Sequence, residues 1–240
     1  MSIMELWCTG YLVQLSQSHP MPEVQFIILA ALSVLVIAIL IPYLLGSLNS
    51  AVVLSRLLYR DDIRNHGSGN AGTTNMLRTY GKAAALLTLL GDALKTAIAV
   101  CFASFLLSAD VGGWIAALFC VIGHIFPVYY RFRGGKGVLC AATAMAILSP
   151  LAFVCALLCF IFIVSITKYV SLGSIFGSLT LPLFVNFENR IFPPFLMGID
   201  ALIAVMMALL IVWCHRENIK RIRAGKESKL SFKKKDIERK

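Results

Sequence analysis

The sequence predicts an all-α integral membrane protein, a bundle of seven transmembrane helices with the N-terminus outside the cell and the C-terminus in the cytoplasm. Of its 240 residues, 59% are hydrophobic and only 14% are charged, whereas about 25% of the residues in a soluble domain are charged. The apolar residues form charge-free runs near the roughly 20-residue length that crosses the hydrocarbon layer of a membrane. The basic residues collect in the loops on one side. This composition excludes a soluble enzyme, a disordered chain and a nucleic-acid-binding domain.

The first three spans follow directly from the charge-free runs. No charged residue occurs in residues 24–55, so a first helix fits within 26–48. A second span covers about 83–108 and is interrupted by two charged residues, and a third covers about 111–130. Each of these runs is long enough to cross the hydrocarbon layer as a helix.

The next run is ambiguous in length. Residues 137–167 carry no charge, and 31 residues are many for one span and few for two. Proline cannot continue a helix from the residue before it without losing a hydrogen bond, so Ser149-Pro150 is expected to divide the run into two helices. Two further spans are predicted within 169–187 and 195–214.

The positive-inside rule fixes the expected number and orientation of the spans. With two helices in the ambiguous run, 20 of the 22 Lys and Arg residues lie on one side of the membrane. With a single helix there, the basic C-terminal tail would be pushed outside. The predicted organisation is therefore an N-terminal extension (1–25), a seven-helix membrane domain (26–214) and a basic cytoplasmic tail (215–240).

The loop after the first span, residues 66–78, has the sequence HGSGNAGTTNMLR. It formally matches GxGxxG, but a membrane helix rather than a strand precedes it, so a dinucleotide site is not expected. Its glycines let the backbone approach a ligand closely, and Thr73 or Thr74 is expected to cap a short helix whose free amides favour an anion. Arg78 adds a full positive charge one turn later. We predict a phosphate-binding loop, with a flexible polar loop as the alternative.

The second polar cluster, residues 123–137, has the sequence GHIFPVYYRFRGGKG. It lacks the first glycine and the final Ser or Thr of a nucleotide-binding P-loop. The glycines on both sides of Lys136 leave its ammonium and the neighbouring amides open to a phosphate. Arg131 is interpreted as an ordinary positive-inside anchor, and His124 as a structural hydrogen-bonding residue more readily than a catalyst.

The third polar cluster, residues 215–227, follows the last span with the sequence HRENIKRIRAGKE. If the helix continues, His215 and Asn218 share one face and point toward the bundle. The side chains expected to reach water or lipid headgroups are those of Arg216, Lys220 and Arg223.

Asp92 and Lys95 lie three residues apart inside the second predicted span. Charged groups in a membrane are costly enough to imply pairing or function. A mutual ion pair and a role in shaping the site both stay open.

Together the three clusters resemble the motifs of the bacterial acyl-phosphate:glycerol-3-phosphate acyltransferases, the PlsY family, approximately GSGNPGATNxxR, GHxFPxxxxFKGGKG and HxxNIxRLxxGxE. The resemblance covers about residues 26–227. The sequence departs from the family's usual residues at several positions, among them Ala71 for a proline, Thr73 for an alanine, Arg133 for a lysine and Lys226 for a threonine.

The resemblance implies transfer of a fatty acyl group from acyl phosphate to the 1-hydroxyl of sn-glycerol 3-phosphate, which gives lysophosphatidic acid and phosphate, in the first step of phospholipid synthesis. It implies a multi-pass protein of the bacterial inner membrane. The expected partners are the two substrates, the lipid bilayer and, as a further candidate, the soluble enzyme that makes acyl phosphate, but no nucleic acid. No metal and no other cofactor is expected, because acyl phosphates are already activated and positioning with charge stabilisation suffices.

The resemblance also assigns site residues. The catalytic ones are Ser68, Arg78, Lys136 and His215. The substrate-binding ones are Gly67, Gly69, Asn70, Thr74, Asn75, Arg133, Gly134, Gly135, Gly137 and Asn218. The main alternative is a membrane transporter of phosphate or another small anion, although transporter sites usually lie near the bilayer midplane between repeats, and here the polar motifs cluster on one side.

Overall fold

The computed structural model describes residues 9–18, 22–193 and 198–230, and in these residues every regular element is a helix. The α-helices are α2 (Tyr11–Ser18), α3 (Glu23–Ser33), α4 (Ile41–Ser47), α5 (Ser50–Tyr59), α6 (Thr73–Tyr80), α7 (Lys82–Leu107), α8 (Trp114–Ile125), α9 (Val138–Leu148), α10 (Pro150–Thr167), α11 (Val170–Ile191), α12 (Ile199–Cys214) and α13 (Arg216–Arg223). A π-helical stretch, Val34–Leu40, joins α3 to α4. Short 3-10 or π-helical turns, Ile63–Asn65, Ala109–Gly113 and Val128–Tyr130, occur in three of the connections.

The multi-pass helical membrane fold is confirmed. Among the described residues, five helical segments are long and apolar enough to span a membrane: Glu23–Tyr59, Lys82–Leu107, Ala109–Tyr130, Pro150–Thr167 and Val170–Ile191. A sixth results if α12 and α13, which bend by 51° between them, are counted together. The remaining predicted span corresponds to α9, whose 11 residues extend about 16 Å, roughly half the hydrocarbon thickness. Seven spans and their orientation therefore stay predictions.

The helix boundaries agree with several sequence expectations. The predicted break at Ser149-Pro150 is confirmed, because α9 ends at Leu148 and α10 begins at Pro150. The first membrane helix already begins at Glu23, inside the predicted extension. Parts of that extension, of the basic tail and of the last predicted span lie outside the described residues.

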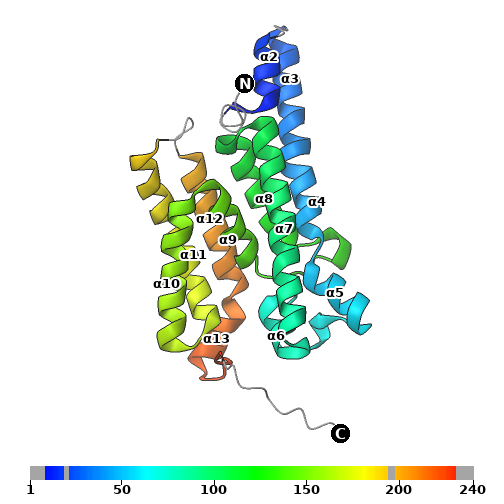
Figure 1. The fold of residues 1–240 in the computed structure, drawn as a ribbon, viewed down its shortest axis with the longest axis vertical. Coiled ribbons are helices and arrows are strands. Elements are labelled where there is room, and N and C mark those ends of the chain that lie inside the picture. Colours follow the sequence, from blue (N-terminus) through cyan, green and yellow to red (C-terminus); the bar gives the residue numbers. More distant parts are fainter. Residues whose placement is uncertain (1–8, 19–21, 194–197, 231–240) are drawn as a thin grey trace.

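The three polar motifs gather at one end of the bundle. Figure 1 shows α5, α6 and α13 together at this end, whereas α2 lies at the opposite end beside α3. The connection between α10 and α11 also lies there, because the backbone amide of Leu230, just beyond α13, donates to the carbonyl of Lys168 at 2.7 Å. The prediction that the motifs share one side of the bundle is thus confirmed as a matter of geometry.

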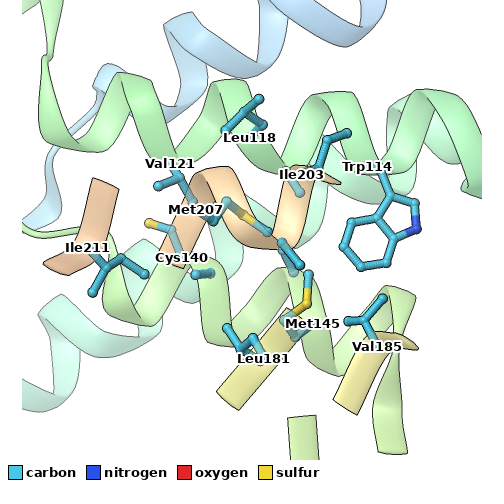
Figure 2. Packing of buried hydrophobic residues seen from close by; sticks show 14 of the residues in the cluster. Trp114, Leu118, Val121, Cys140, Met145, Leu181, Val185, Ile203, Met207 and Ile211 are labelled. Atoms are coloured by element: carbon cyan, nitrogen blue, oxygen red, sulfur yellow. The ribbon is translucent and has the colours of Figure 1, made fainter. Parts of the chain in front are cut away.

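The largest hydrophobic cluster lies between α8, α9, α11 and α12 (Figure 2). Trp114 and Val121 of α8 face Met145 of α9, Val185 of α11 and Met207 of α12. Alanines fill many of the remaining buried positions of this cluster. Small side chains let membrane helices pack closely, so this cluster holds α8 and α9 against α11 and α12.

Two glycines bring α4 and α8 into backbone contact. A Cβ at Gly46 would collide with the backbone of Cys120, and a Cβ at Gly123 would collide with the carbonyl of Tyr43. The Tyr43 hydroxyl also donates to the carbonyl of Phe126 at 3.0 Å. The end of α8, which carries the second motif, is thereby fixed to the first membrane helix.

We expect Gly123→Leu to destabilise the protein, because a larger side chain forces α4 and α8 apart and overpacking costs about 1–3 kcal/mol. The thermal unfolding midpoint of the purified protein in detergent measures this. The control, Ala83→Leu, places the same side chain at an exposed position near the start of α7. An unchanged midpoint for Gly123→Leu would show that the close contact contributes nothing.

Candidate functional site

A cavity of about 450 Å³ opens where the three motifs meet. Its polar lining comes from all three motifs, and a second cavity of about 320 Å³ adjoins it. Both cavities share Ser68, Asn70, Lys136 and Asn218. The predicted motifs therefore form one site.

The other part of the main cavity is apolar and is lined by α7, α9, α10 and α11. Its larger apolar side chains are Leu89, Leu139, Phe153, Leu157, Phe160 and Leu181. Of these, Leu89 on α7 and Leu157 on α10 lie next to Leu90 and Leu158, which are 53% and 60% exposed and line neither cavity. The apolar part of the cavity thus reaches the face of the protein that lipid would cover.

Asn75 holds the loop of the first motif in shape. Its Nδ2 donates to three carbonyls of residues 63–70 at 2.9–3.2 Å, and its Oδ1 accepts from the amide of Ser68 at 3.1 Å. Gly67, with φ +58°, passes so close that a Cβ there would collide with Oδ1 of Asn75. Asn75 was predicted to bind substrate, but its side chain is engaged by the loop itself.

The short helix of this motif starts without the predicted cap. The N-cap position of α6 is Gly72, which has no side chain, and the helix begins at Thr73. Thr74 lines the cavity one residue later. The first turn of α6 therefore lines the cavity without a side-chain acceptor at its cap.

The Gly-Gly pair of the second motif fastens its loop to α8. The amides of Gly134 and Gly135 donate to the carbonyls of Ile125 and His124 at 3.2 and 3.0 Å. A Cβ at either glycine would collide with this end of α8. These amides were expected to face a phosphate, but they are used within the fold, whereas Gly137 at the start of α9 lines the cavity.

Arg64, two residues before the first motif, connects this segment to the second motif. Its guanidinium pairs with Asp62 at 2.7 Å and donates to the carbonyls of Tyr130 and Arg133 at 2.9 and 3.1 Å. The hydrogen bonds from Arg64 hold the pKa of Asp62 far below its usual range. This connection was missed by the sequence analysis, since the pairing joins residues that are distant in the chain.

Lys136 lies where the second and third motifs meet. Its Nζ donates to Oδ1 of Asn218 at 2.5 Å. Burial lowers the pKa of Lys136 to about 8; Arg221 and Arg78 act in the same direction, and Glu227 opposes them. At neutral pH the ammonium is therefore mainly charged but poorly solvated, which strengthens its attraction for a phosphate.

His215 is buried at the bend between α12 and α13, and it lines the cavity. Its Nδ1 lies 2.7 Å from the carbonyl oxygen of Ile211, and since a carbonyl only accepts, Nδ1 carries the proton. Burial, reinforced by the charge of Lys136, lowers the pKa of His215 to about 4. The imidazole is neutral at pH 7, and its Nε2 is a hydrogen-bond acceptor.

A buried polar cluster supports the site from the membrane side. The ammonium of Lys95 lies 2.9 Å from Oδ1 of Asp92 and from the carbonyls of Gly46 and Leu48, and 3.0 Å from Nδ1 of His124. The two carbonyls are available because the first membrane helix breaks between α4 and α5. Asp92 and Lys95 therefore form a structural ion pair, and Asp92 is also part of the site wall, as is His124.

The cavities bring together most of the predicted site residues. The main cavity is lined by Ser68, Asn70, Thr74, Asn75, Arg78, Lys136, Gly137, His215 and Asn218, and the second also by Gly69. Four predicted residues line neither cavity: Gly67, Arg133, Gly134 and Gly135. The side chain of Arg133 is exposed to solvent.

The cavity also contains polar residues that were not predicted. Three serines of α11, Ser171, Ser174 and Ser178, line it along one helix face, and their spacing of three and four residues could have indicated this. Glu227, the last residue of the third motif, lines it as well. Within the described part of the chain, no group of three or more His, Cys, Asp or Glu side chains is placed to hold a metal ion.

Residues 36–225 match the family model described as glycerol-3-phosphate acyltransferase. A glycerol-3-phosphate acyltransferase of Coxiella burnetii (strain CbuG_Q212) is 42% identical over an alignment of 203 residues, which covers 82% of this chain and 98% of the relative. Another, from Pseudomonas syringae pv. syringae (strain B728a), is 45% identical over 188 residues, 77% of this chain and 92% of the relative.

The fold is similar to two crystal structures of PlsY, an integral membrane glycerol 3-phosphate acyltransferase. The glycerol 3-phosphate form has a TM-score of 0.73 and 32% identity, and the alignment covers 83% of this chain and 96% of that one. The lysophosphatidic acid form has a TM-score of 0.70 and 30% identity over the same shares of the two chains.

We expect Lys95→Met to destabilise the fold strongly, because it leaves the buried carboxylate of Asp92 without its cation, a loss of about 3–5 kcal/mol. The double variant Asp92→Asn/Lys95→Met removes both charges and should recover part of that loss. Thermal unfolding in detergent compares the two. A double variant that unfolds as early as the single one would show that the uncompensated charge is not the cause.

Proposed function

Since the chain belongs to the glycerol-3-phosphate acyltransferase family and is a membrane enzyme that acylates glycerol 3-phosphate, we propose that its acyl donor is acyl phosphate. The acyl group passes directly to the 1-hydroxyl of sn-glycerol 3-phosphate. The products are lysophosphatidic acid and inorganic phosphate. We place this reaction in the inner membrane of a bacterium, at the cytoplasmic face.

One observation carries the proposal: a single cavity joins a cationic mouth to an apolar wall that reaches the lipid-facing surface. Both proposed substrates carry phosphate, and the donor also carries a long hydrocarbon chain. Arg78 and Lys136 supply positive charge at the mouth, and the apolar side chains of α10 and α11 suit the acyl chain. An anion transporter, the alternative from the sequence, has no use for this apolar part, and the family assignment decides against it.

In the proposed site, two groups of residues hold the phosphates. Arg78 and Lys136 act as charged donors, with Ser68, Asn70 and Thr74 as neutral partners from the first motif. The start of α9 at Gly137 adds backbone amides, which favour an anion at a helix N-terminus. Asn218 orients Lys136, and Asn75 and the Gly134-Gly135 pair keep the loops in place.

The proposed chemistry is a direct displacement. The 1-hydroxyl oxygen attacks the carbonyl carbon of acyl phosphate, a tetrahedral oxyanion forms, and the bond from that carbon to the phosphate oxygen breaks. Lys136 and Arg78 stabilise the charge that moves onto the leaving phosphate. The hydroxyl proton goes to a substrate phosphate oxygen or to Nε2 of His215, whose lone pair is available at neutral pH. Because the donor is already activated, no acyl-enzyme is required.

We expect Arg78→Ala and Lys136→Ala each to lose most activity, because each leaves a phosphate charge without its cation in a poorly hydrated site. Such a loss costs about 2–4 kcal/mol, or roughly 30- to 1000-fold in rate. The assay follows lysophosphatidic acid formed from acyl phosphate by purified protein. Lys220→Ala is the control, because its side chain is 73% exposed and pairs with Glu217. Near-normal activity of folded Lys136→Ala would contradict the proposed site.

The proposed orientation predicts which positions an impermeant thiol reagent reaches in intact cells. In a background without native cysteines, Arg131→Cys and Lys220→Cys should stay unlabelled, because they lie at the end that we assign to the cytoplasm. Arg190→Cys, at the far end of α11, should be labelled. Permeabilised cells, in which all three react, control for accessibility. Labelling of Lys220→Cys from outside would reverse the orientation.

A further inference from the structure

Glu227 is a buried carboxylate at the mouth of a site that binds phosphate in the proposed function. Its side chain is only 6% exposed. Oε1 accepts from the hydroxyl of Ser171 at 2.8 Å and from Nδ2 of Asn218 at 2.6 Å, and Oε2 accepts from Nε of Arg221 at 2.8 Å. Although burial opposes it, these hydrogen bonds lower the pKa of Glu227, so the group is ionised at neutral pH. An anion beside a phosphate site repels the phosphate, so another contribution of the carboxylate must offset this cost.

The donor and acceptor roles of the neighbouring groups indicate what this contribution is. A carboxylate only accepts hydrogen bonds, and an ammonium only donates them. Asn218 lies between the two, with its NH₂ group on Glu227 and its Oδ1 on the ammonium of Lys136. If the amide were reversed, its NH₂ would face the ammonium and its oxygen the carboxylate. Glu227 therefore fixes the orientation of the amide that holds Lys136.

The segment that carries Glu227 is anchored on both sides of this contact. Beyond it, the amide of Leu230 donates to the carbonyl of Lys168, and the guanidinium of Arg78 donates to the carbonyl of Ser228 at 3.4 Å. Through Ser171 the carboxylate also joins the start of α11 to α13. The segment cannot shift without breaking contacts on three elements of the site.

We propose that Glu227 is a positioning residue for glycerol 3-phosphate: through Asn218 it holds the ammonium of Lys136 in place for the substrate phosphate. It touches neither reacting group itself. The inference rests on the proposed function, in which Lys136 binds phosphate.

The positioning role predicts an effect on pH dependence that mere structural support would not give. The charged and titratable groups around Lys136 are Arg78, Arg221, Cys214, His215 and Glu227. Glu227 is the carboxylate among them and favours the charged form of Lys136. Glu227→Gln removes that charge and should lower the pKa of Lys136 below its value of about 8. Binding that needs the ammonium, and is lost as pH rises through this pKa, should then be lost at lower pH.

The experiment measures the Kd of glycerol 3-phosphate for the full-length protein in lipid nanodiscs between about pH 6 and pH 9, without an acyl donor. We expect Glu227→Gln to raise the Kd at pH 7 roughly tenfold, because the hydrogen bond from Asn218 then ends on a neutral oxygen and loses its charge assistance. It should also move the alkaline loss of affinity to lower pH. Glu23→Gln, an exposed carboxylate at the start of α3 and far from the site, makes the same change in net charge and should leave the alkaline loss where it is.

Glu227→Asp keeps the charge but shortens the reach to Asn218. It should raise the Kd without moving the pH at which binding is lost, and it decides the question if Glu227→Gln does not fold. A wild-type Kd for folded Glu227→Asp and, where it folds, for Glu227→Gln would overturn the positioning role. If the variants change glycerol 3-phosphate binding as expected but acyl phosphate gives no turnover, the positioning role of Glu227 is supported and only the proposed donor is refuted.

Discussion

The ammonium of Lys95 is the constraint on which the architecture of the site depends. A charge inside a membrane bundle must be surrounded by acceptors, and here they come from three places: the carboxylate of Asp92, the imidazole of His124 and two carbonyls at the break in the first membrane helix. The break places Asn49 at the start of α5, where it accepts from an amide of that helix and donates to the carbonyl of Ala71 in the first motif. His124 in turn carries the carbonyl that holds Gly135. The loops of the first and second motifs are thus both connected to one buried cation.

His124 and His215 show how neighbouring groups give the same type of side chain opposite hydrogen-bonding properties. Nδ1 of His124 faces an ammonium, which only donates, so a neutral His124 carries its proton on Nε2. Nδ1 of His215 faces a carbonyl, which only accepts, so its Nε2 is left as an acceptor. Of the two, only His215 has a ring nitrogen left as an acceptor, and burial lowers its pKa so that it is neutral at pH 7. The structural interpretation of His124 agrees with this arrangement.

Features set by local pattern were predictable from the sequence, and features set by long-range pairing were not. The apolar runs located the membrane helices, and proline marked the break at Ser149-Pro150. The helical spacing of His215 and Asn218 correctly turned both side chains inward, with Lys220 outward. By contrast, a glycine amide is free or engaged according to what the fold brings to it. The motif alone could not show that Gly134 and Gly135 bind the end of α8, or that Glu227 reaches Ser171 across the mouth of the site.

The exposed leucines of the cavity wall have a kinetic meaning. Because Leu89 and Leu157 line the cavity beside the outward-facing Leu90 and Leu158, a reactant with a hydrocarbon tail can reach the site sideways from the bilayer, while glycerol 3-phosphate arrives from water. The concentrations of the two reactants then have different units: the tailed reactant is counted per area of membrane, and glycerol 3-phosphate per volume of solution. The effective concentration of the tailed reactant is a mole fraction, which falls when inert lipid is added even though its total amount in the sample is unchanged.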